Sequence, residues 1–268
     1  MSHLRKLTIS LALAGALSAV GMSPALAAAT TTKRAAAPAP AATGTTVHPN
    51  VDPGTVIAVI QKAYGIYKTF LSGGSSGQLA TQQIIDAINQ SETAVISQID
   101  AVAAADVRAC AQSAVINFAD FDALTPDNQQ AFALDATNCV TRADSLLGAV
   151  TDKAAKDQLG FAVNTVGPIA LMARARTGLT NTGLTAVLVD ANQTVYNQLI
   201  PACSVVAVRE PGAPTEYQVT CTAYNGDQGW DSFIKSAQAN AAIPAVRDQA
   251  ARNISWLAAE KVLPQLTS

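Results

Sequence analysis

The sequence predicts a mainly α-helical protein, a multi-helix antiparallel bundle with one small disulfide-bridged β-hairpin near residues 203–223. Apolar residues recur at helical spacing over most of the chain beyond residue 50, and prolines, glycines and helix-capping residues separate the periodic stretches. The cysteines flank two predicted turns in pairs, and we expect each pair to form a disulfide; they are Cys110, Cys139, Cys203 and Cys221.

Residues 1–27 have the pattern of a signal peptide. Arg5 and Lys6 precede an apolar stretch over 7–22, Pro24 follows it, and Ala25-Leu26-Ala27 supplies small residues for cleavage. The apolar stretch is shorter than the roughly 20 residues that a transmembrane helix needs. We therefore expect cleavage after Ala27 and secretion of the remainder as an extracellular protein.

Residues 28–50 are rich in Ala, Thr and Pro, which bury too little surface to offset the entropy of ordering. We expect a disordered tether there and a single domain over 51–268, which is long enough for a sizeable core. Loss of residues 1–27 leaves 15 basic against 19 acidic residues, a net charge of −4. This balance favours neither nucleic acid nor an anionic membrane as a partner.

The helices follow from apolar periodicity and from the residues that begin and end it. A first helix is predicted over 56–71, before Gly73-Gly74, and a second region over 78–122 has two periodic stretches. Thr125-Pro126-Asp127 supplies an N-cap, a proline at the first helical position and a first-turn acid, which open a helix to about residue 150.

Three further helical regions are predicted, at 152–176, 182–200 and 231–263. Pro168 should kink or break the first of these, because it lacks an amide donor, and Pro244 should interrupt the last. Arg174 and Arg176 lie in the last turn before Gly178, where cations stabilise a helix C-terminus; we prefer this explanation to an anion site.

The first cysteine pair lies symmetrically about the turn at residues 124 and 125. Cys110 is 15 residues before Thr125 and Cys139 is 14 after it, so both lie at the same height in an antiparallel helix pair at about 1.5 Å rise per residue. Small neighbours such as Ala111 and Ala136 permit the close approach that a disulfide needs. We therefore expect Cys110 to pair with Cys139.

The second pair repeats this logic in a β-hairpin. Residues 204–209 and 217–223 are rich in Val, Thr and Tyr, and the run between them contains two prolines and Gly212. Cys203 and Cys221 are each nine residues from Gly212, which makes them cross-strand neighbours. We expect this pair to be the second disulfide.

Histidine occurs only at His3 and His48, in the predicted signal peptide and tether. Ser-His-Asp catalysis, Cys-His catalysis and histidine-based metal sites are therefore excluded from the predicted domain of a single chain. Cysteines held in disulfides would also be lost as nucleophiles and as metal ligands. We expect no cofactor and no metal.

Three weaker patterns leave chemistry open. Asp120, Asp122 and Asp127 cluster near the predicted helical turn, and a hydrolase needs only two carboxylates, although turns and caps favour acids for local reasons. Residues 225–231 resemble a calcium loop, but the required sixth-position glycine and distal acid are missing, so a turn followed by an N-cap is preferred. Serine–lysine catalysis would need Ser97, Ser113 or another helical serine to lie beside Lys153, Lys156 or Lys235.

The most apolar stretch beyond the tether covers residues 159–173. Its length is typical of a buried core helix, while a segment that later inserts into a membrane is the alternative. We interpret the chain as a secreted, disulfide-stabilised protein with a non-enzymatic binding role toward an unknown protein or surface ligand. A membrane-inserting helical protein and a carboxylate-dependent hydrolase are the two alternative functions.

Overall fold

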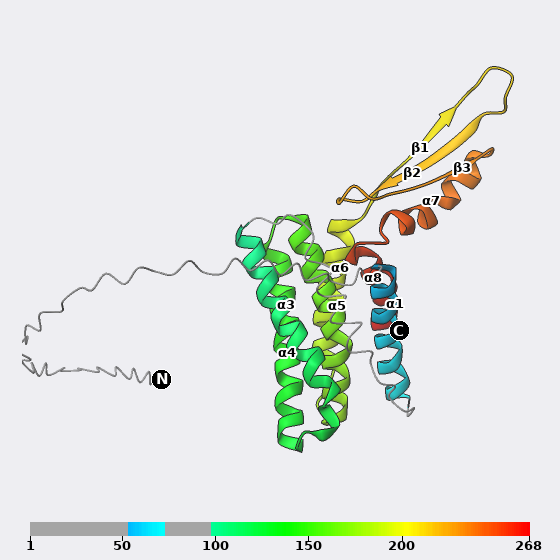
Figure 1. Ribbon diagram of the computed structural model, residues 1–268. Coiled ribbons are helices and arrows are strands. Elements are labelled where there is room, and N and C mark those ends of the chain that lie inside the picture. The colour runs from blue at the N-terminus through cyan, green and yellow to red at the C-terminus, as the bar shows by residue number, and fades with distance from the viewer. Residues whose placement is uncertain (1–52, 73–97) are drawn as a thin grey trace, which may run out of the picture. The chain divides into compact units, whose positions relative to one another are not determined.

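The computed structural model describes residues 53–72 and 98–268, which belong to one structural unit (Figure 1). The predicted signal peptide, the predicted tether and the 73–97 part of the second helical region lie outside the described residues. The described part is mainly helical with a small antiparallel sheet, which confirms the predicted fold class. Its helices are α1 (Pro53–Leu71), α3 (Gln98–Ala119), α4 (Pro126–Ala149), α5 (Lys153–Arg176), α6 (Thr182–Leu199), α7 (Ser236–Ala250) and α8 (Ser255–Thr267), with a short 3₁₀ turn η2 (Phe121–Ala123).

Helices α3 and α4 form the predicted pair around the turn at residues 120–125. The Thr125 side chain accepts a hydrogen bond of 3.4 Å from the Asn128 amide and caps α4, and Pro126 occupies its first turn. The structure joins Cys110 of α3 to Cys139 of α4, with their Cα atoms 5.9 Å apart. The two helices are therefore covalently fixed near the middle of their contact.

Helix α5 is the centre of the bundle, because α1, α3, α4, α6 and α8 all pack against it. Every residue from Leu159 to Ala173 is buried, as expected for a core helix. Pro168 was expected to kink or break this helix; it does not break it, and α5 is continuous from Lys153 to Arg176. Burial against five neighbouring helices outweighs the roughly 3 kcal/mol that proline costs inside a helix.

The strands are β1 (Ala202–Val208), β2 (Glu216–Thr222) and β3 (Gln228–Phe233), in the order β1-β2-β3, all antiparallel. Cys203 lies opposite Cys221 and is bonded to it, with the Cα atoms 4.0 Å apart. The third strand corrects the expectation of a turn and N-cap leading into a helix at residue 231. Residues 228–233 pair with the free side of β2 instead, and the next helix begins at Ser236.

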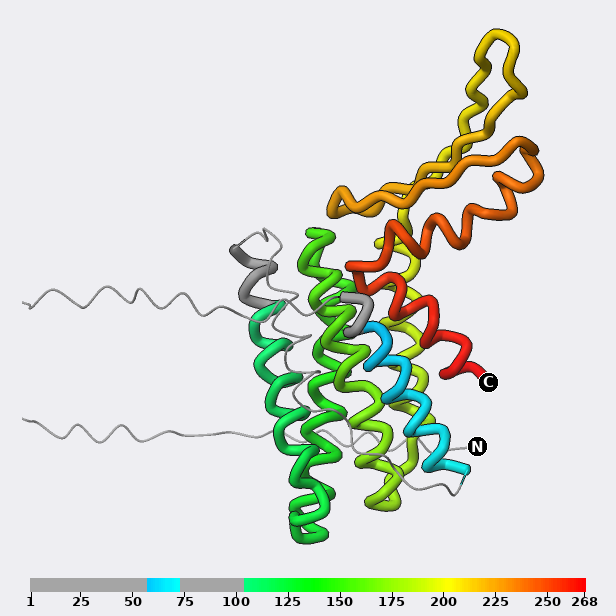
Figure 2. The backbone as a smooth tube through the Cα atoms, turned by 45° about the vertical axis from the view of Figure 1, so that its right-hand side comes forward, coloured from blue at the N-terminus to red at the C-terminus, as the bar shows by residue number. Residues whose placement is uncertain are grey.

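Helix α7 lies along one face of the sheet, as the two views in Figures 1 and 2 show. Their contact encloses a second small core, separate from the core of the bundle, formed by Val219, Cys221, Ala239, Val246 and Ala250. Gly229 is required here, because a Cβ atom at this position would meet the backbone of α7. Among the described elements, α7 covers one face of the sheet and none covers the other.

Candidate functional site

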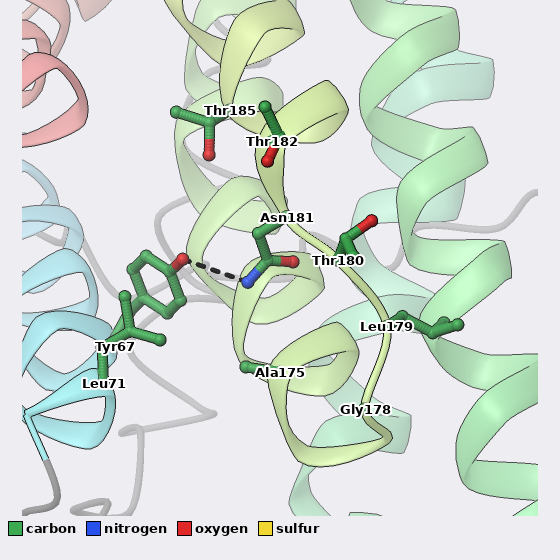
Figure 3. A pocket seen from close by; sticks show the side chains of 9 residues that line it. All are labelled: Tyr67, Leu71, Ala175, Gly178, Leu179, Thr180, Asn181, Thr182 and Thr185. Carbon is green, nitrogen blue, oxygen red and sulfur yellow. Dashed lines mark hydrogen bonds between the residues drawn. The ribbon is translucent and has the colours of Figure 1, made fainter.

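A hollow of about 690 Å³ lies between α1 and the turn that joins α5 to α6 (Figure 3). The Asn181 amide nitrogen donates to the Tyr67 hydroxyl and to the Leu171 carbonyl, both at 3.0 Å. The lining residues carry no carboxylate, amine or thiol; they are Tyr67, Leu71, Ala175, Gly178, Leu179, Thr180, Asn181, Thr182 and Thr185. The hollow is accessible, but its lining supplies no charged group for acid–base chemistry.

A buried polar cluster forms where α5, α8 and the turn after β2 meet. Asp157 of α5 accepts a hydrogen bond of 2.9 Å from the Tyr224 hydroxyl and one of 2.6 Å from the Ser255 amide. Burial raises the pKa of Asp157 to about 6, although the hydrogen bonds from Ser255 and Tyr224 lower it. Burial and the neighbouring Asp157 charge likewise raise the pKa of Tyr224.

A carboxyl group with a shifted pKa beside a hydroxyl is a common feature of catalytic sites, but in this cluster the carboxylate is buried. Asp157 is only 7% exposed and Ser255 is 0% exposed, so the carboxylate faces protein and not solvent, while Tyr224 is half-buried. The cluster joins three segments that are distant in sequence, and we assign it a structural role. Sequence pattern does not predict this cluster; the one available signal was an acid two residues before the apolar stretch 159–173.

The acids at the α3–α4 turn do not converge on a site. Asp120, Asp122 and Asp127 are all exposed, and Asp122 is paired with the Arg176 guanidinium. The same guanidinium lies 4.8 Å from the centre of the Phe121 ring. Arg176 therefore anchors the end of α5 to this turn, and the three acids lack the enclosed setting of a hydrolase.

The serine–lysine arrangement has no support among the described residues. Ser113 accepts a hydrogen bond of 3.2 Å from Asn117 and borders a small hollow of about 130 Å³, whose lining contains no lysine. Lys156 is hydrogen-bonded to Gln198. Ser97 lies outside the described residues.

Residues 225–231 form the turn between β2 and β3 and the first part of β3. The Asn225 side-chain oxygen accepts the Asp227 amide at 3.0 Å, and Gly226 has a positive φ of 89°. The Asp227 carboxylate accepts from Asn253 at 2.6 Å, which ties this turn to the segment before α8. Within residues 53–72 and 98–268, no group of three or more metal-ligating side chains occurs.

None of the helices that the structure describes is long and apolar enough to cross a membrane. The apolar stretch 159–173 is the interior of α5, enclosed by the helices around it.

The face of the sheet turned away from α7 exposes apolar side chains. Trp230 of β3 is 69% exposed and Val206 of β1 is 56% exposed. Thr220 lies opposite Trp230 on the central strand, and Ser204 lies opposite Thr220. Alternation along the strands assigns this face, here called the outer face, to Ala202, Ser204, Val206, Val208, Glu216, Gln218, Thr220, Thr222, Gln228, Trp230 and Ser232.

Comparison of the chain with protein-family models, with curated proteins and with solved structures found no match. The two disulfides suggest an extracellular protein, because such bonds persist in oxidising compartments. The class that the fold defines is thus a disulfide-stabilised helical protein with a small appended sheet.

Proposed function

We propose that the chain is a secreted, non-enzymatic recognition protein whose contact surface is the outer face of its sheet. In this proposal residues 1–27 are a cleaved signal peptide, residues 28–50 are a tether, and residues 51–268 are one domain. The bundle is a rigid support, because its central helix is buried at every residue from 159 to 173 and its α3–α4 pair is covalently closed. The cluster with perturbed pKa values is closed, and the accessible hollow lacks charged groups, which favours binding over catalysis.

The observation that carries the proposal is the exposure of Trp230 on the edge strand β3 of this face. A tryptophan side chain usually buries most of its large apolar surface, and it is enriched where proteins make contacts. Trp230 lies on β3, whose backbone is held by antiparallel pairing with β2 and by contact with α7. Because an indole side chain has only two rotatable torsions, it loses little conformational entropy when it binds.

The chemistry of the outer face fits a neutral carbohydrate. The π-face of the Trp230 indole is electron-rich and attracts the positively polarised C–H groups of a sugar ring. Hydroxyl and amide side chains surround it, among them Thr220, Gln218 and Gln228, and these can donate to and accept from sugar hydroxyls. The outer face has no basic residue, and its acid, Glu216, lies at the end of β2 far from Trp230 in register, which disfavours anionic ligands.

Retention of the secreted protein on insoluble neutral polysaccharides, such as cellulose, chitin and α-glucans, tests this proposal. We expect Trp230→Ala to reduce retention at least about tenfold, since one stacked aromatic contributes more than about 1.4 kcal/mol. Leu134→Ala is the matched control, because Leu134 is also an exposed large apolar residue but lies on α4.

Failure of the native protein to bind any of these polysaccharides would contradict the carbohydrate assignment. A hydrolytic activity that persists in Trp230→Ala, and that one Asp or Glu substitution abolishes, would contradict the non-enzymatic role.

A further inference from the structure

The free edge of β1 exposes backbone groups at alternate residues. The Cα atoms of Cys203 and Cys221 are only 4.0 Å apart, which identifies them as a non-hydrogen-bonded pair of the β1–β2 ladder. The amide and carbonyl of Cys203 therefore point away from β2. By alternation, the same holds for Val205 and Ala207, so three residues direct six backbone groups toward the free edge.

The two edges of the sheet differ in how they are protected. On β3, the Asp231 carboxylate accepts the Ser232 amide at 2.8 Å, which occupies a donor on that edge and adds a negative charge. Residues 202–208 of β1 contain no charge and no proline, and no described strand pairs with the outer edge of β1. Natural sheets usually protect a free edge of this length with charges, proline or bulges. The unprotected edge indicates that β1 has a partner.

We propose that β1 pairs antiparallel with β1 of a second copy of this chain, around a two-fold axis through Val205. In this register Val205 faces Val205 of the second copy, and Cys203 faces Ala207. Each of the three facing pairs exchanges two hydrogen bonds. All six free backbone groups of each β1 strand therefore gain a hydrogen-bonding partner. The edge is thus complementary to itself, as a two-fold interface requires.

The absence of charge on β1 favours a second copy over a charged partner. In a symmetric interface every charged side chain near the axis meets a like charge, and β1 has none to repel. Val206, which is 56% exposed, would lie opposite Ser204 of the second copy. This contact would cover part of the Val206 side chain. The occupant is therefore the same seven-residue strand.

The two-fold axis is perpendicular to the sheet, so the two outer faces lie on the same side of a continuous six-stranded sheet. Both copies of Trp230 would then face one surface. If the proposed carbohydrate function holds, this arrangement gives bivalent binding to a polymer with repeated units. The pairing itself does not depend on that function.

Sedimentation equilibrium of the intact, oxidised secreted protein tests the proposal from micromolar to millimolar concentration. We expect the native protein to reach twice the mass of the chain. Ala207→Pro removes an amide that points to the free edge, and Ala207 is exposed, so the monomer should keep its fold. Two hydrogen bonds are lost from the symmetric dimer, and we expect its dissociation constant to rise at least about 30-fold.

Ser232→Pro is the matched control, because it places the same residue on the opposite edge and should leave the dimer intact. A second pair of variants avoids proline altogether: Val206→Lys should weaken the dimer, while Gln218→Lys, its cross-strand neighbour on the central strand, should not. Trp230→Ala should remain dimeric, which separates this test from that of carbohydrate binding. A native protein that stays monomeric at millimolar concentration, or a dimer that Ala207→Pro and Val206→Lys leave unchanged, would overturn the proposal.

Discussion

Asp157 and Tyr224, 67 residues apart in the sequence, are joined by a hydrogen bond of 2.9 Å inside the protein. Asp157 belongs to the central helix of the bundle, and Tyr224 follows the last residues of β2. The Ser255 amide, at the start of α8, donates to the other carboxylate oxygen. One buried side chain therefore links the bundle, the sheet and the C-terminal helix, and several properties of the protein depend on it.

The stability of the protein should depend on the ionisation of Asp157. Its pKa rises from 3.8 to about 6 on folding, so the folded state binds more protons than the unfolded state between these values. The contribution of Asp157 to the free energy of unfolding is therefore largest below about pH 4. It decreases by up to about 3 kcal/mol as the pH rises through about 6. Urea unfolding across this range should show the native protein losing stability relative to Asp157→Asn.

The control for this experiment is Asp120→Asn, which removes an exposed carboxylate at the α3–α4 turn. This variant should keep the pH dependence of the native protein. Equal pH dependence in Asp157→Asn and the native protein would show that Asp157 does not titrate in this range.

Removal of the Tyr224 hydroxyl should destabilise the protein. Tyr224→Phe leaves the buried Asp157 carboxylate with one donor fewer, at a cost of about 1–3 kcal/mol at neutral pH. Because the lost hydrogen bond lowered the pKa of Asp157, that pKa should rise further in the variant. Chemical denaturation at neutral pH, together with the pH dependence of stability, measures both effects. An unchanged stability in Tyr224→Phe would contradict the role assigned to this contact.

Two helical glycines should respond to alanine with opposite signs. A Cβ atom at Gly167 would clash with the Tyr64 hydroxyl and the Leu188 side chain, so Gly167→Ala should destabilise the protein by about 1–3 kcal/mol. A Cβ atom at Gly148, on α4, would have open space around it. Gly148→Ala should therefore stabilise the protein by about 0.5–1 kcal/mol. Thermal melting of the two variants distinguishes the cases. Equal shifts would show that α1, α5 and α6 do not pack as closely as described.

Each disulfide should stabilise the fold by about 3–4 kcal/mol in the loop-entropy model, since the sequence separations are 29 and 18 residues. Replacement of Cys110 and Cys139 together by alanine should weaken the bundle. The same replacement of Cys203 and Cys221 should loosen the sheet and reduce Trp230-dependent binding. Urea unfolding and retention on polysaccharide give the two readouts.

Peptide mapping without reduction checks the pairing of the cysteines, and a crossed pair such as Cys110 with Cys203 would contradict the fold.

The parts of the fold that local sequence specifies could be predicted. Thr125 and Pro126 mark a helix start by local chemistry, and the distances of the cysteines from the two turns give the pairing that the structure has. The third strand could not be predicted, because Asp231-Ser232 is typical of a helix start. Its pairing with β2 depends on a partner that periodicity does not reveal. The continuity of α5 through Pro168 is likewise a result of packing by distant helices.

The candidate site was harder to predict than the fold. The sequence suggested acids at a turn, but Asp120, Asp122 and Asp127 are exposed. The residue with the perturbed pKa, Asp157, gains its partners from segments 67 and 98 residues away. The exposure of Trp230 follows from which face α7 covers, and this is a tertiary property.

Iodide quenching of tryptophan fluorescence tests the proposed recognition surface most directly. The described part of the chain has an exposed tryptophan, Trp230, and a buried one, Trp256, so iodide should quench the first and spare the second. Soluble neutral oligosaccharides should protect the native protein from quenching, and Trp230→Ala should lack the quenchable component. Quenching of Trp230 that is unchanged by saturating cello-, chito- and malto-oligosaccharides would contradict the assignment of the outer face as a carbohydrate-binding surface.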